Sequence, residues 1–135
     1  MTFRFLLDTH IVVWWLTAPR KLSSEQLGVL QRAAGANENV AICAMTLIEI
    51  AFMLRQGGRA RLRIPLDELL RQMDRPPYMH ILPITREIAS DVVSITGALR
   101  EPADCTIVAT ARVHGLRLLT SDQRIIQSKL VAVVE

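Results

Sequence analysis

Short apolar runs alternate with amphipathic segments along most of the chain, and this alternation constrains the fold more than any other feature. The runs that are too short for helices, and that suit buried strands, are residues 3–7, 40–43, 79–84, 116–119 and 130–134. Between them, apolar residues recur at helical spacing, as in Ile88, Val92, Ile95 and Leu99. Strands that alternate with helices predict an α/β fold, a three-layer α/β/α sandwich around a central, mainly parallel sheet of about five strands.

Capping signals and chain breakers predict where the helices begin and end. Ser23 and Gln26 form a capping signature before a helix that ends near Gly35. The TLIE sequence at residues 46–49 has the same pattern and predicts a helix from Thr46 to residues 57–58. Further helices are expected over residues 11–16, after Pro65, over 85–99 and from Pro102 to residue 113.

Length and composition favour one globular domain over residues 1–135. Half of the 135 residues are hydrophobic and 21% are charged, which excludes a disordered chain. The two cysteines, Cys43 and Cys105, are expected to be small buried hydrophobes, with Cys105 partly exposed, and they suit a reducing compartment. No apolar run approaches the roughly 20 residues of a membrane helix, so we expect no membrane partner and a cytoplasmic location.

Four acidic residues differ from the other acids, which fall on polar helix faces or in first helical turns. Each of the four adjoins or lies within an apolar segment, where an expected strand ends or the next helix starts: Asp8, Glu49, Asp104 and Asp122. In a parallel sheet these junctions share one edge, which is the edge where open α/β folds bind ligands. We therefore expect the four carboxylates to converge.

Converging carboxylates repel one another, and we expect no lysine or arginine beside these four to relieve the repulsion. A bound cation would relieve it. Sites made only of carboxylate oxygens favour Mg²⁺ or Mn²⁺, and such a cluster can hold two ions for in-line phosphoryl displacement. The alternative for each acid taken alone is helix capping, since acids are common in first helical turns. Without metal, repulsion should raise the pKa of at least one of the four.

Four segments resemble, in chain order, the motifs of PIN-domain ribonucleases, in particular the VapC-like toxins of bacterial toxin–antitoxin pairs. The first is LLDTH at residues 6–10 with WWL at 14–16, and the second is TLIE at 46–49. The third is PAD at 102–104 with IVATA at 107–111, and the fourth is LLTSD at 118–122. Each motif is weak alone, whereas four in this order are specific.

The resemblance implies a Mg²⁺- or Mn²⁺-dependent endoribonuclease whose metals are held by Asp8, Glu49, Asp104 and Asp122. It further implies an RNA substrate, a small antitoxin whose tail covers the acidic cleft, and a homodimer. The chain departs from the family at Glu101, where an aspartate is frequent, and at Cys105, where an arginine is frequent. The first departure keeps a carboxylate, whereas the second removes a contact to phosphate or helix.

Several other residues have both a functional and a structural interpretation. His10 could act as a general base, although a two-metal site does not require one. Trp14 and Trp15 could stack on bases, but their apolar surroundings favour packing in the core or against another subunit. Three threonines could steady the carboxylates or metal-bound waters by hydrogen bonds, with an N-cap as the alternative for the second: Thr9, Thr46 and Thr120.

Arginine dominates the basic residues, since only Lys21 and Lys129 of the 16 lysines and arginines are lysines, and the net charge is +3. Guanidinium groups bind phosphate in bidentate fashion. The densest basic run flanks two glycines and could follow an RNA backbone, contact a protein partner or form a solvated turn: Arg55, Arg59, Arg61 and Arg63.

Three rival functions at the same edge of such a sheet lack their signatures. A phospho-receiver would need a lysine after a late strand, and neither Lys21 nor Lys129 is so placed. A haloacid-type phosphatase would need a second aspartate where His10 stands, and the chain has no G-x-G-x-x-G loop for a dinucleotide. The alternative that stays open is a catalytically silent nucleic-acid- or partner-binding module on the same fold.

Overall fold

The computed structural model describes residues 3–36, 38–55, 65–73 and 79–135. Its centre is a five-stranded sheet in the order β3-β2-β1-β4-β5, in which every pairing is parallel. The strands are Phe5–Leu7 (β1), Val40–Cys43 (β2), Met79–Leu82 (β3), Arg117–Leu119 (β4) and Val133–Val134 (β5). The expected parallel sheet is therefore confirmed.

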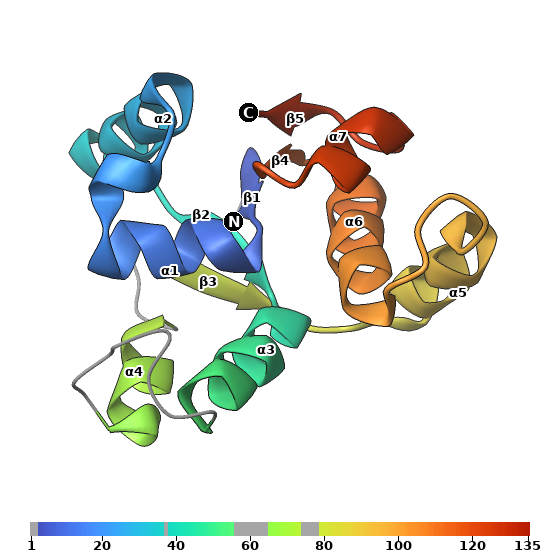
Figure 1. Ribbon diagram of the computed structural model, residues 1–135, viewed down its shortest axis with the longest axis horizontal. Helices are drawn as coiled ribbons and strands as arrows, with labels where there is room; N and C mark the ends of the chain where they lie inside the picture. Colours follow the sequence, from blue (N-terminus) through green and yellow to red (C-terminus); the bar gives the residue numbers. More distant parts are fainter. Residues whose placement is uncertain (1–2, 37, 56–64, 74–78) are drawn as a thin grey trace.

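Helices cover both faces of the sheet, which gives the expected three layers (Figure 1). Neighbouring residues of a strand enter separate cores, because successive side chains point to opposite faces. Leu7 packs in one core with Ile11 and Leu30, whereas Leu6 packs in the other with Ile88 and Ile107. The helices are Thr9–Thr17 (α1), Ser24–Gly35 (α2), Ala44–Arg55 (α3), Leu66–Met73 (α4), Arg86–Ile95 (α5), Pro102–His114 (α6) and Gln123–Ser128 (α7), with a short 3-10 turn at Pro19–Lys21 (η1).

Most helix ends carry the signals that the sequence shows. Ser23 and Gln26 form a complete capping box at the start of α2. Thr85 caps α5 through a hydrogen bond that its hydroxyl accepts from Ile88 N. Gly115 ends α6 in the left-handed conformation, at φ +66°, which glycine adopts without a steric penalty.

The start of α3 differs from the prediction. The helix begins at Ala44, directly after β2, so Thr46 is a buried residue of its first turn and not its N-cap. The Sγ atom of Cys43 accepts a hydrogen bond from Met45 N at 3.4 Å and so takes part of the capping role. The TLIE pattern at residues 46–49 therefore does not cap α3, and the Thr46 hydroxyl can form hydrogen bonds elsewhere.

Three strands are shorter than expected, and helix α7 was not predicted. The strands expected over residues 3–7, 79–84 and 130–134 pair only over the ranges given above. Helix α7 is six residues long and buries only Ile125, so it shows almost no apolar periodicity. The breaks expected at residues 57–58 and 76–77 lie outside the described residues. Within those that are described, no helix has the length and apolar character needed to cross a membrane.

Candidate metal-binding active site

The carboxyl ends of β1, β2 and β4 lie next to one another, because Leu7 pairs in register with both Ile42 and Leu119. Asp8 and Thr120 directly follow β1 and β4, and α3 follows β2. A pocket of about 230 Å³ lies at this edge. It is lined by all four expected acids together with five further residues: Asp8, Glu49, Asp104 and Asp122, then Thr9, His10, Glu101, Ala103 and Arg124.

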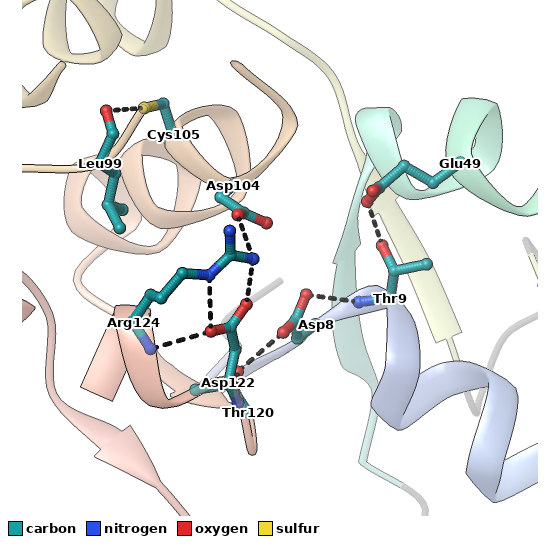
Figure 2. A network of polar contacts seen from close by, with 9 residues as sticks. All are labelled: Asp8, Thr9, Glu49, Leu99, Asp104, Cys105, Thr120, Asp122 and Arg124. Carbon is teal, nitrogen blue, oxygen red and sulfur yellow. Dashed lines mark hydrogen bonds and ion pairs between the residues drawn. The ribbon is translucent and has the colours of Figure 1, made fainter. Parts of the chain in front are cut away.

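Asp8 is the most deeply placed of the four acids, with 6% of its surface exposed. It caps α1, since its Oδ1 accepts a 2.8 Å hydrogen bond from Thr9 N, and its Oδ2 accepts a 2.7 Å bond from the Thr120 hydroxyl (Figure 2). Burial raises the pKa of Asp8, and these two hydrogen bonds oppose the rise. Asp8 therefore both caps α1 and lines the pocket.

Glu49 is held by a chain of two threonine hydroxyls. Thr9 Oγ1 donates a 2.5 Å hydrogen bond to Glu49 Oε1 and lies 3.1 Å from Thr46 Oγ1. Because the Thr9 proton is engaged with Glu49, the Thr46 hydroxyl is the donor to Thr9. Thr46 and Glu49 share one face of α3, since they are three residues apart.

Asp104 and Asp122 have a basic partner, which corrects the expectation that none adjoins the four acids. Arg124 lies two positions after Asp122, and its Nη2 is 3.0 Å from Asp122 Oδ2 and 3.3 Å from Asp104 Oδ2. Asp122 also caps α7, where its Oδ1 accepts a 2.9 Å bond from Arg124 N. The D-x-R spacing of Asp122 and Arg124 is the sequence signal for this pairing.

The pKa values of the two paired acids move in opposite directions. Burial, together with the negative charges of Asp122 and Asp8, raises the pKa of Asp104 to about 6. The hydrogen bond from the Arg124 side chain lowers the pKa of Asp122. The pKa of one acid is thus raised as expected, but burial contributes more to the rise than the expected repulsion does.

The donor set suits a hard divalent cation. Five carboxylates line the pocket, and carboxylate oxygens are the ligands that Mg²⁺ and Mn²⁺ prefer. As the side chains stand, no three histidine, cysteine, aspartate or glutamate side chains of the described residues form a ready metal cage. The reason is visible in Figure 2, where Glu49 turns to Thr9 while Asp104 and Asp122 turn to Arg124.

The remaining candidates divide between the pocket, the core and the surface. His10 lines the pocket, with its ring centroid 6.0 Å from that of Trp14. Trp14 and Trp15 are half-buried against the core that includes Leu7, as the packing interpretation expects. Cys105 is fully buried and its thiol donates to Leu99 O, so it is not partly exposed.

Arg55 is exposed at the end of α3 and stays outside the pocket lining. The other residues of the basic run, Arg59, Arg61 and Arg63, lie outside the described residues. Two functional candidates, Arg124 and Glu101, were not predicted as site residues from the sequence. Both line the pocket.

Comparison with known proteins agrees with this geometry. The family model of the PIN domain matches residues 5–129. Ribonuclease VapC22 from Mycobacterium tuberculosis is 32% identical over 121 residues, which cover 89% of this chain and 88% of that protein. The chain therefore belongs to the PIN-domain family, and the resemblance to its VapC-like members is confirmed.

Two solved structures have the same fold. One is VapBC2 from Rickettsia felis bound to a promoter DNA fragment, with a TM-score of 0.72, 14% identity and 98% of each chain covered. The other is a toxin–antitoxin complex from Klebsiella pneumoniae, with a TM-score of 0.68, 20% identity, and 96% of this chain and 95% of that one covered.

Proposed function

We propose that this chain is a metal-dependent endoribonuclease and the toxin of a type II toxin–antitoxin pair. One observation carries the proposal: four carboxylates from four separate segments line one pocket at the carboxyl edge of the sheet. Membership of the PIN family and the identity to a VapC ribonuclease support RNA as the substrate.

The proposed metal ligands are Asp8, Glu49, Asp104 and Asp122, with Mg²⁺ or Mn²⁺ as the cation. The bound cation would supply an activated water and stabilise negative charge on the phosphate. The chain's own part is to keep the carboxylates in place: Thr120 holds Asp8, and Thr9, backed by Thr46, holds Glu49.

The proposed partners follow from the toxin assignment. A cognate antitoxin would cover the acidic pocket, since an unrestrained nuclease would damage its host, and the toxin itself would form a homodimer. Of the two solved structures described above, one is a toxin–antitoxin complex and the other is VapBC2 bound to promoter DNA. We further propose that the protein acts on RNA in the cytoplasm and that residues 1–135 form one nuclease domain. The run from Arg55 to Arg63 is proposed to contact RNA phosphates or the antitoxin.

Cleavage of RNA by the purified protein tests the proposal against the silent binding module. After removal of metal with EDTA, we expect no cleavage, and addition of Mg²⁺ or Mn²⁺ should restore it. A Glu49→Gln preparation, purified in the same way, controls for contaminating nucleases and should stay inactive. Tight RNA binding without cleavage in either metal would favour the silent module.

A further inference from the structure

Arg124 bridges two of the four carboxylates from the mouth of the pocket (Figure 2). Its Nη2 contacts Asp122 Oδ2 at 3.0 Å and Asp104 Oδ2 at 3.3 Å, and its Nε contacts Asp122 Oδ1 at 3.3 Å. The guanidinium therefore engages both oxygens of Asp122 and one of Asp104. These two acids come from α6 and from the start of α7, and the arginine ties them together.

Arg124 is also the only lysine or arginine among the described residues that line the pocket, against five carboxylates. The remaining lining residue that could carry positive charge is His10. A single guanidinium cannot neutralise five carboxylates, so the pocket keeps a net negative charge that attracts further cations.

The arginine can leave this position at little cost. Its side chain is 66% exposed, and it stands in the first turn of a short helix that is anchored by Ile125. An ion pair whose guanidinium is this exposed stabilises a protein only slightly, because water solvates the arginine when the pair is broken. Binding of a divalent cation by several carboxylates is therefore more favourable than the ion pairs of Arg124.

A guanidinium and a divalent cation on the same two carboxylates repel each other, and Arg124 Nη2 occupies a lone pair of Asp104 Oδ2 and of Asp122 Oδ2 that a metal could use. We propose that Arg124 is an internal counter-cation that competes with the divalent metal for Asp104 and Asp122. Metal binding displaces the guanidinium from the carboxylates, and loss of the guanidinium strengthens metal binding. This inference rests on the proposed metal site.

Direct Mn²⁺ titration by calorimetry tests the competition without measuring activity. The variants are Arg124→Gln and, as a matched control, Arg112→Gln, which removes an arginine paired with Asp91 at 2.8 Å outside the pocket lining. Arg124→Gln should bind Mn²⁺ about fivefold more tightly than the wild type, since one exposed ion-pair cluster is lost. Arg112→Gln should bind as the wild type does.

The arginine Nε–H resonances give a second readout on the wild-type protein. On addition of Mg²⁺ to the chelator-treated protein, the Arg124 resonance should shift as its hydrogen bond to Asp122 is lost, while that of Arg112 should not. Unchanged or weaker Mn²⁺ binding by Arg124→Gln, or a stationary Arg124 resonance in the presence of metal binding, would overturn the competition and leave the metal site intact. If neither wild type nor Arg124→Gln binds Mn²⁺, both the site and the inference are wrong.

Discussion

The hydroxyl of Thr120, at the end of β4, donates a 2.7 Å hydrogen bond to the buried Oδ2 of Asp8, at the end of the neighbouring strand β1. The same hydroxyl oxygen accepts a 3.1 Å bond from Asp122 N. One threonine thus connects two acids that are far apart in the sequence. Thr120 therefore holds Asp8 and Asp122 in position relative to each other at the carboxyl end of β4.

Replacement of Thr120 by valine keeps the side-chain shape and removes both hydrogen bonds. The free energy of unfolding should fall by about 1–3 kcal/mol, because the buried Asp8 carboxylate loses a partner. Metal affinity should fall about 10- to 100-fold, as is typical when a group that orients a ligand is removed. Urea unfolding and Mn²⁺ titration measure the two effects. Thr96→Val, which removes an exposed hydroxyl bonded to Val93 O, is the control, and equal behaviour of the two variants would contradict the role of Thr120.

Metal binding should depend on pH through Asp104. Its pKa is raised to about 6, so the carboxylate is ionised above pH 6 and takes up a proton below it. Since a cation binds the ionised form, protonation of Asp104 should lower Mn²⁺ affinity by about fivefold as the pH drops from 6 to 5. Calorimetric titration over pH 5–7, with circular dichroism to show that the fold persists, measures this. An affinity that stays level over this range would contradict the role of Asp104 as a ligand.

Gln26 should stabilise the segment that follows β4. Its side chain is fully buried, and its Nε2 donates to Thr120 O at 3.2 Å, Ser121 Oγ at 3.1 Å and Val134 O at 3.2 Å. Gln26→Leu leaves buried carbonyl groups without this partner and should lower the free energy of unfolding by about 2–4 kcal/mol. Gln31→Leu, at an exposed position of the same helix, is the control in urea unfolding. A loss no larger than that of the control would show that Gln26 is dispensable.

The α/β architecture could be predicted from the sequence, because the two patterns that indicate it are local. Short apolar runs and helical apolar stripes can be recognised from residues that are close together in the sequence. The same holds for the residues that cap or end helices: Ser23, Thr85 and Gly115. Helix α7 and the start of α3 were not predicted, because no local sequence signal marks them. Their limits are fixed by tertiary contacts, namely the burial of Ile125 and the direct passage of β2 into α3.

The acids of the pocket could be predicted because strand ends in a parallel sheet share an edge. The sequence also indicated that Thr9, Thr46 and Thr120 could hydrogen bond to the carboxylates, but which acid each would reach depends on side-chain orientation and could not be predicted. The bond from Thr9 to Glu49 spans 40 residues, and that from Thr120 to Asp8 spans 112. Arg124 was within reach of sequence analysis through its spacing from Asp122, but its second contact, to Asp104, required the fold.

The basic run should contribute to RNA binding through phosphate contacts. Arg59→Ala combined with Arg61→Ala should flatten the log–log salt dependence of single-stranded RNA binding by roughly 1.4, at about 0.7 per lost contact. An Asp8→Asn background prevents cleavage during the measurement. The same salt slope in the parent and in the double variant would assign the run to a solvated turn or to antitoxin contact alone.

The central claim is that the carboxylate pocket cuts RNA with the help of a divalent cation, and the rate of RNA cleavage by Asp8→Asn tests it most directly. Asparagine keeps the side-chain size and an oxygen that can cap α1, so the thermal unfolding temperature should stay close to that of the wild type. Loss of the charge should reduce cleavage in saturating Mg²⁺ or Mn²⁺ by about 10²-fold or more. A folded Asp8→Asn protein that cleaves RNA at the wild-type rate would contradict the assignment.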